Sequence, residues 1–367
     1  MNSSIDCKNL RILFVNDRPH VPQVTGGLQW NTHEICLALK RRNLEAALLC
    51  EVTPAGSIGF INRFKRRLKV FGDCPCDNIL GYTCYRGWKP IDAVSNICKQ
   101  WKPDVVVVQG SKPEMGLISL AKGIPTFYYF HFEAVDLLPD GEWRKLTGFL
   151  ACSAFISHSM SKRYDVPISV LYPLVSVARA ITTVIPQNVL SFGLSYEKGA
   201  DFVINLAARL PKVKFKIIET WSGDIARNDE LRKRAANIQN VEICSAVADV
   251  RKYLSEAKVL LVPSRWQEGW GRVVTEAQLN GIPVITSGTG GLPEATGTGG
   301  LNIPLDGGFE AWATTVERLN SDADYYAEAC QLSLLAAQRE FISEKYLIDN
   351  FIEILTTDHS AVKYETH

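Results

Sequence analysis

Two glutamates eight residues apart, Glu268 and Glu276, flank a glycine-rich turn that could hold an anion. The segment between them reads EGWGRVVTE, with Gly269 and Gly271 just ahead of a predicted helix that begins near Arg272. Glycines let a ligand approach the backbone closely, and the N–H groups of a helix's first turn favour an anion. Carboxylates accept hydrogen bonds from neighbouring hydroxyls. The segment therefore predicts a site for a ligand with an anionic centre and hydroxyls on both sides.

The spacing alone also fits a solvated loop acid at Glu268 and a helix-surface charge at Glu276. The surroundings favour the ligand site, because a predicted strand ends at Val262 and Gly281–Pro283 ends the helix before the strand Val284–Thr286. Such a loop lies at the carboxyl end of a parallel strand, where ligands of α/β sheets bind. A nucleoside diphosphate sugar has the required layout, with phosphates at the helix start and sugar hydroxyls to either side.

Short apolar runs alternate with helical patterns along the whole chain, which predicts parallel sheets covered by helices. The strands expected in the first half are Leu10–Asn16, Ala46–Leu49, Val105–Gln109, Pro125–Phe130 and Ala154–Ile156. Those expected in the second half are Asn188–Phe192, Lys214–Glu219, Val241–Cys244, Val259–Val262 and Val284–Thr286. The segment 172–187 shows neither period, so we place a domain junction there.

The predicted architecture is two Rossmann-like α/β domains that face each other across a cleft. We expect a first domain at residues 1–178, a second at 186–342, and a C-terminal helix at 343–367 that packs back on the first. The 367 residues carry 40 Lys and Arg against 39 Asp and Glu. This balance argues against a protein that binds nucleic acid over its whole surface, and 46% hydrophobic residues argue against a disordered chain.

Location and metal binding follow from weaker signals. The chain start has no signal-peptide pattern and no apolar run is long enough to span a bilayer, so we expect a cytoplasmic protein with reduced cysteines. Cys74, Cys76 and Cys84 lack a fourth zinc ligand. Asp322-Ala-Asp324 fits a helix N-cap better than a metal motif. We expect no metal and no cofactor.

Read together, these segments resemble the retaining glycosyltransferases of the GT-B fold, in particular family GT4. The stretch from Glu268 to Glu276 resembles the E-x7-E signature of that family, and Gly193–Leu210 resembles its G-x-x-x-E-K-G stretch. Gly26–Gly27 resembles its N-terminal glycine turn, and Tyr129–Glu133 matches the position of a functional histidine. The resemblance covers nearly the whole chain. It implies a metal-independent hexosyltransferase that uses a UDP- or GDP-linked sugar and a glycan or lipid-linked acceptor in surface polysaccharide biosynthesis.

The resemblance also implies a role for each site residue. Lys198 would pair with the diphosphate, Glu268 would contact the donor sugar, and Glu276 would bind the ribose hydroxyls. His131 would contact the donor sugar from the first domain. A solvated lysine and a structural histidine are the alternatives for Lys198 and His131. The remaining expected donor contacts, largely through backbone groups, are Gly27, Val247, Gly269, Trp270, Gly271, Arg272 and Val273.

The sequence departs from the family pattern at Gly193, where an arginine usually forms a cation pair with the lysine. Arg18, Arg265 and Arg272 are candidates for the second cation. Two other functions stay open: a non-hydrolysing nucleotide-sugar epimerase and a non-catalytic nucleotide-sugar-binding protein.

Residues 60–71, FINRFKRRLKVF, form a predicted helix with Phe60, Phe64, Leu68 and Phe71 on one face and basic residues around it. Such a helix fits a peripheral contact with the inner face of an anionic membrane. It equally fits a helix packed on the sheet with a solvated basic face.

Overall fold

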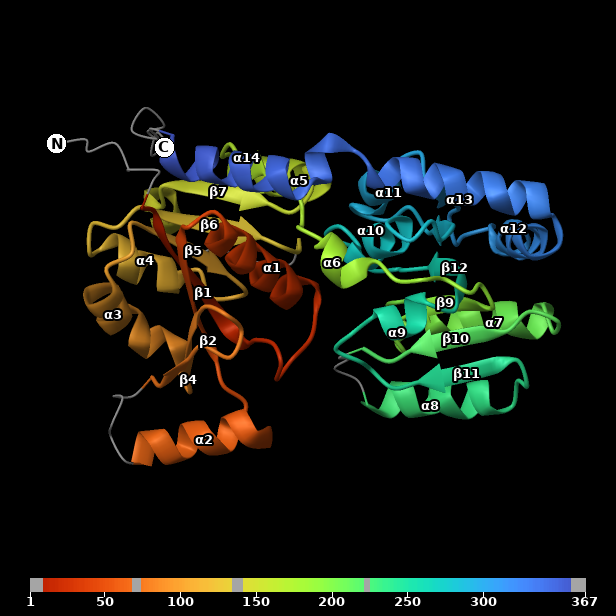
Figure 1. Cartoon of the computed structure of the whole chain (residues 1–367), viewed down its shortest axis with the longest axis horizontal. Coiled ribbons are helices and arrows are strands. Elements are labelled where there is room, and N and C mark those ends of the chain that lie inside the picture. The colour runs from red at the N-terminus through yellow and green to blue at the C-terminus, as the bar shows by residue number, and fades with distance from the viewer. Residues whose placement is uncertain (1–8, 68–73, 134–140, 221–224, 358–367) are drawn as a thin grey trace. The chain divides into compact units, whose positions relative to one another are not determined.

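The chain forms two compact units in a computed structural model that describes residues 9–67, 74–133, 141–220 and 225–357 (Figure 1). The first unit comprises residues 1–174 together with 344–367, and the second comprises residues 175–343. The chain therefore leaves the first unit once and returns to it for its last helix.

The first unit is built on a sheet whose described strands run in the order β3-β4-β2-β1-β5-β6-β7-β8. All neighbours are parallel except β3, which runs antiparallel to β4 at one edge. The strands are β1 Arg11–Pro19, β2 Glu45–Glu51, β3 Cys76–Asp77, β4 Thr83–Gly87, β5 Val105–Gln109, β6 Thr126–Phe130, β7 Gly148–Ala151 and β8 Ser169–Val170. The helices are α1 Gly27–Arg41, α2 Gly56–Arg67, α3 Pro90–Trp101, α4 Glu114–Leu120, α5 Ala154–Tyr164, α14 Glu344–Thr356 and the 3-10 turn η1 Glu142–Lys145.

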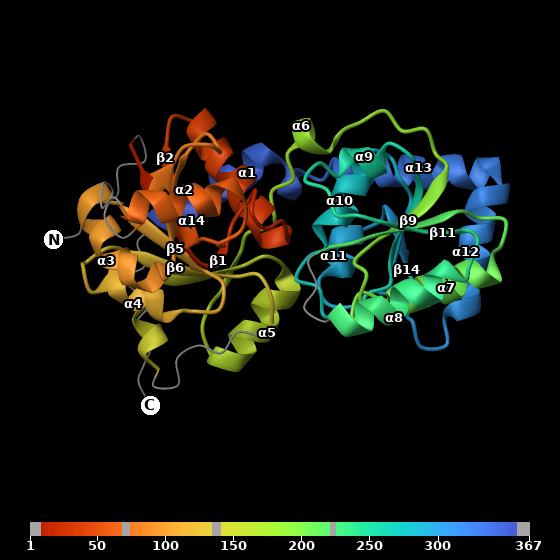
Figure 2. The same ribbon diagram turned by 90° about the horizontal axis from the view of Figure 1, so that it is seen from below.

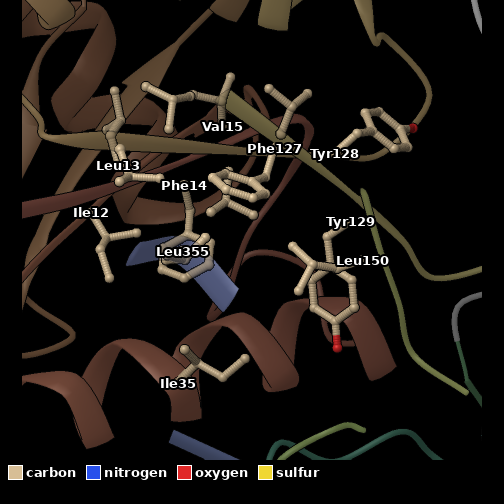
Figure 3. Close-up of a cluster of buried hydrophobic side chains, with 14 of the residues drawn as sticks. Ile12, Leu13, Phe14, Val15, Ile35, Phe127, Tyr128, Tyr129, Leu150 and Leu355 are labelled. Carbon is tan, nitrogen blue, oxygen red and sulfur yellow. The ribbon is translucent and has the colours of Figure 1, made fainter. Parts of the chain in front are cut away.

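The core of this unit explains why its central strands carry unbroken apolar runs. The β5 sequence VVVVQ is buried along its whole length, because helices cover both faces of a parallel sheet. On the face covered by α1 and α14, Phe14 stacks on Phe351 of the last helix with ring centroids 6.0 Å apart. Figure 3 shows Leu355 of α14 and Ile35 of α1 on the same side of the sheet, with Leu355 next to Phe14. The last helix thus completes the core of the first unit.

The second unit has a sheet in which the described strands are all parallel, in the order β11-β10-β9-β12-β13-β14. Figure 1 labels β12, β9, β10 and β11 in this sequence, and Figure 2 shows the same unit turned by 90°. The strands are β9 Asn188–Phe192, β10 Phe215–Ile218, β11 Val241–Cys244, β12 Ala257–Val262, β13 Val284–Thr286 and β14 Gly300–Asn302. The helices are α6 Val177–Ala180, α7 Ala200–Arg209, α8 Ile225–Ala236, α9 Arg251–Leu254, α10 Arg272–Gln278, α11 Leu292–Thr296, α12 Phe309–Ser321, α13 Ala323–Ala337 and the 3-10 turn η2 Glu340–Ile342. None of the helices in the described part of either unit is long and apolar enough to cross a membrane.

Each sheet reverses its strand order at one point, between β1 and β5 in the first unit and between β9 and β12 in the second. The loops that leave neighbouring strands at such a point diverge to opposite faces of the sheet and leave a crevice for ligands. The loops after β9 and β12 carry Lys198 and Glu268, so this topology positions the two residues before any side-chain contact is considered.

The prediction of two Rossmann-like α/β domains is confirmed, and one predicted strand is wrong. Ala154–Ile156 begins helix α5, and the strand is the preceding segment Gly148–Ala151. The side chain of Ser153 accepts a hydrogen bond from the Ile156 N–H at 3.1 Å, which caps the helix. The short apolar run after this cap is therefore a helix start.

Candidate active site

An ion pair joins the loops that follow β9 and β12. The Nζ atom of Lys198 lies 2.5 Å from Oε1 of Glu268, and the Ser264 hydroxyl donates to the same oxygen at 2.8 Å. The Glu268 side chain is 13% exposed and the Lys198 side chain is 37% exposed. One carboxylate oxygen is thus held by two donors in a partly open position, which orients the side chain.

The loop that follows β13 supports the backbone of Glu268. The Gly291 N–H donates to the Glu268 carbonyl at 2.7 Å, and the Ser287 hydroxyl donates to the Ser264 carbonyl at 2.6 Å. A Cβ on Gly290, whose φ is +62°, would lie 2.4 Å from the Glu268 carbonyl oxygen. Only glycine allows this close approach, so Gly290 belongs to the site although it carries no side chain.

Gly193 stands where the family usually has an arginine, and it packs against the side chain of Lys198. Its φ is +106°, and a Cβ there would lie 2.7 Å from Cγ and 2.8 Å from Cβ of Lys198. The lysine stem thus packs directly on the glycine backbone. An arginine at this position would displace the stem, so the residue that departs from the family pattern shapes the lysine position instead.

Helix α10 holds a second ion pair, which is more deeply buried. Arg272 Nη2 lies 3.6 Å from Glu276 Oε1, and the two side chains are 7% and 9% exposed. Glu276 is therefore no solvated helix-surface charge. In the preceding loop, Gly269 and Trp270 are buried, and the Trp270 indole N–H donates to the Thr275 hydroxyl at 3.0 Å.

The remaining residues expected around this helix lie at its start. Gly271 takes a φ of +90° at the N-cap, and Val273 is half-buried in the first turn. Of the candidates for the second cation, Arg265 is bound to both oxygens of Asp201 at 2.7 and 3.0 Å. Its guanidinium is thereby committed to a carboxylate within the protein.

Val247 lies in the loop after β11 and is half-buried. The loop is braced on its far side, where Arg251 pairs with Asp249 and lowers the pKa of that carboxyl by hydrogen bonding. The Tyr253 hydroxyl donates to the Ser245 carbonyl at 2.7 Å. Backbone groups near Val247 are thus held at the carboxyl edge of the second sheet.

The expected residues of the first unit lie at the carboxyl edge of its own sheet. His131 follows β6, and its Nε2 lies 2.7 Å from Oε1 of Gln109 at the end of β5. The same Gln109 oxygen accepts from the Thr32 hydroxyl of α1 at 3.0 Å. Gly27 is the exposed first residue of α1 and not part of the preceding loop. Arg18 lies over the Phe132 ring, 5.5 Å from its centroid.

Sequence reasoning missed the residues that hold Glu268 in place, namely Ser264, Gly290 and Gly291. The only sequence signal for Ser264 was its position four residues before Glu268. The reading of Asp322 as an N-cap is confirmed, because its carboxylate accepts from the Tyr325 N–H at 2.9 Å. In the described ranges, no three His, Cys, Asp or Glu side chains gather as a metal-binding group.

Comparisons with known proteins show what the second unit resembles in sequence. Residues 186–322 match the model of the family described as Glycosyl transferases group 1. An uncharacterized 41.2 kDa protein in the cps region of Klebsiella pneumoniae is 31% identical over 180 residues, which is 46% of this chain and 45% of the relative. A D-inositol 3-phosphate glycosyltransferase of Mycobacterium sp. (strain KMS) is 31% identical over 131 residues, covering 34% of this chain and 30% of the relative. The chain thus matches less than half the length of these curated relatives.

Solved structures match over nearly the whole chain. A glycosyltransferase from Rickettsia africae superposes with a TM-score of 0.72 at 15% identity, covering 95% of this chain and 98% of that one. Anabaena Alr3699/HepE in complex with UDP gives a TM-score of 0.68 at 17% identity, covering 95% and 100%. The fold is therefore the GT-B fold, and its second unit carries the sequence pattern of group 1 glycosyl transferases.

Proposed function

We propose that the protein is a retaining, metal-independent glycosyltransferase that moves a hexose from a UDP- or GDP-linked sugar to a glycan or lipid-linked acceptor. The process would be surface polysaccharide biosynthesis, in the cytoplasm or at the inner face of the membrane. The Lys198–Glu268 pair at the strand-order reversal of the second sheet is the observation that carries this proposal. The family match over residues 186–322 and the cps-region relative support the same reading.

In this proposal, cleavage of the bond between the anomeric carbon and the diphosphate places negative charge on the phosphate. Lys198 has three donors, so it can keep Glu268 and still bind a phosphate oxygen. Backbone N–H groups at Arg272 and Val273 would add hydrogen bonds to the same group. Each well-placed donor to the developing charge lowers the activation free energy by about 3 kcal/mol.

Glu268 would orient the donor sugar through its hydroxyls, and Glu276 would bind the ribose. The leaving phosphate itself would accept the proton of the attacking hydroxyl on the same face of the sugar, so no protein nucleophile is needed. Displacement through a covalent intermediate on Glu268 is the competing route. His131, Gly27 and Val247 would contribute contacts to the sugar, the diphosphate and the base.

The function is tested by incubating the chain with UDP-, GDP- and ADP-sugars and a set of acceptors, with and without a chelator. Release of nucleoside diphosphate that survives the chelator, with an unchanged anomeric configuration in the product, is expected. Epimerised sugar nucleotide would show the epimerase instead. Saturable binding of a nucleotide sugar, with no turnover in the presence of any of the acceptors, would show a binding protein.

A further inference from the structure

Helix α2 presents an apolar row to solvent, and we propose that this row with its flanking cations is a docking surface for an anionic lipid membrane. Figure 1 shows α2 below β2 and β4, apart from α1 and α3. The predicted segment 60–71 is described as far as residue 67, and Leu68 and Phe71 lie outside the described residues. The argument therefore rests on α2 alone.

The face of α2 that packs on the protein is not the phenylalanine face. Ile58 and Asn62 are buried, and the Asn62 side chain donates to the Ile58 carbonyl at 2.9 Å. Lys65 on the same side donates to the Cys76 carbonyl at 3.1 Å. Gly59 lies against the turn that leads into the helix, where a Cβ would lie 2.5 Å from the Pro54 carbonyl oxygen. The helix is thus anchored through one face.

The opposite face carries the aromatic residues. Phe60 is 65% exposed, Phe64 is 58% exposed, and Ile61 beside them is also exposed. The alternative of a helix packed on the sheet with a solvated basic face fits the exposed Arg63 and Arg67, but it leaves Phe60 and Phe64 exposed as well. Large apolar side chains gathered on an exposed helix face mark an interaction surface.

The basic residues next to Phe60 and Phe64 indicate that the partner is anionic. Arg63 and Arg67 are exposed and lie one helical turn apart, three residues after Phe60 and Phe64 respectively, so they form a parallel row on the same side. Between Gly56 and Arg67 the sequence has four basic residues and no acidic one. Apolar side chains that enter the acyl boundary, with arginines at the level of anionic headgroups, are the arrangement of an interfacial helix. The apolar row needs hydrocarbon, which a nucleic acid backbone does not offer.

The test is sedimentation of the full chain with vesicles of phosphatidylglycerol and phosphatidylcholine in equal parts, compared with phosphatidylcholine alone. We expect binding to the anionic vesicles that weakens at high salt. The double variant Phe60→Ser/Phe64→Ser should bind about 100-fold more weakly. The variant Arg63→Gln/Arg67→Gln should lose about 30-fold.

The matched control is Leu332→Ser/Leu335→Ser, which removes two exposed apolar side chains from α13 of the second unit. It should bind vesicles like the unchanged protein. Thermal unfolding checks that each variant is folded, and Phe64→Trp reports insertion directly through a blue shift of its emission. Equal binding to both vesicle types, or undiminished binding by the phenylalanine variant, would overturn the proposal. The measurement needs no sugar donor, so its outcome is independent of the proposed enzyme activity.

Discussion

Lys198 and Glu268 are seventy residues apart in sequence, yet their charged groups lie 2.5 Å apart. They meet because β9 and β12 are neighbours in the sheet and their loops leave the same edge. The protein's own contacts hold the pair together, so under the proposed function both groups are preorganised for a diphosphate sugar. Because the lysine is partly exposed, the pair contributes little to stability, and its removal should be felt mainly in activity.

Loss of either partner should therefore abolish most turnover while the fold survives. For Lys198→Ala and Glu268→Gln we expect nucleoside diphosphate release to fall about 100-fold or more, because each removes a group that acts on the reacting donor. Rates are measured at saturating donor, with circular dichroism as the check on folding. The control is Lys212→Ala, an exposed lysine that precedes β10 at the opposite edge of the sheet. Undiminished rates in both site variants would refute the assignment.

Gly193→Ala should reduce turnover by displacing the lysine stem that packs on it. The added methyl would meet Lys198 within 2.8 Å, and the positive φ adds strain. Gly307→Ala is the matched control, because Gly307 also has a positive φ of +71° but no atom within 4 Å of the added Cβ. In the Lys198→Ala background the contact with Cγ is gone while that with Cβ remains, so Gly193→Ala should cost less activity than in the unchanged protein. Independent, additive losses would show that the glycine acts on something other than Lys198.

Glu276→Gln should lower stability as well as nucleotide affinity, in contrast to Glu268→Gln. It replaces the carboxylate that lies 3.6 Å from the buried Arg272 guanidinium with a neutral amide, at a cost of about 3 kcal/mol in the free energy of unfolding. Urea unfolding of the two variants gives the comparison, and calorimetric titration with UDP and GDP measures affinity. If Glu276→Gln unfolds like the unchanged protein, the ion pair does not carry the stability that its burial implies.

Stability should fall in mild acid because of His20. This side chain is fully buried with its Nε2 2.8 Å from the Tyr82 hydroxyl, and burial, Arg86 and His33 lower its pKa well below 6.5. The unfolded chain then binds a proton that the folded chain rejects, so stability is full above pH 6.5 and is lost as the pH falls. The loss approaches about 1.4 kcal/mol per pH unit.

Urea unfolding between neutral and mildly acidic pH measures this slope. His20→Gln should have lower stability at neutral pH but a flatter profile. A variant whose slope equals that of the unchanged protein would show that other groups cause the acid sensitivity.

The sequence was enough to predict the two α/β domains and the loops that carry Lys198 and Glu268, because strand–loop–helix order and glycine positions are local features. It did not predict that the Ser264 hydroxyl shares the Glu268 oxygen, or that Gly290 supports its backbone. Those contacts depend on how separate loops meet in space, which periodicity does not encode. The strand expected at Ala154–Ile156 failed for a related reason: three apolar residues fit a strand and a helix start equally, and the Ser153 cap decides.

For helix α2, too, the sequence did not predict which residues pack on the rest of the protein. Its spacing predicted an apolar face with Phe60 and Phe64 but could not tell whether that face would be buried. The structure buries Ile58 and Asn62 instead. The face that carries Ile58 and Asn62 thus packs on the protein, although Phe60 and Phe64 give the stronger apolar signal.

The return of α14 to the first unit has a consequence for biosynthesis. During translation, Phe14 is made early, but its stacking partner Phe351 is made only after the entire second unit has been synthesised. The second unit is a continuous stretch of chain and can fold as soon as it is complete. A chain that ends after residue 343 would therefore have a complete second unit and a first unit whose aromatic core is uncovered. We expect chaperones and proteases to bind this exposed core.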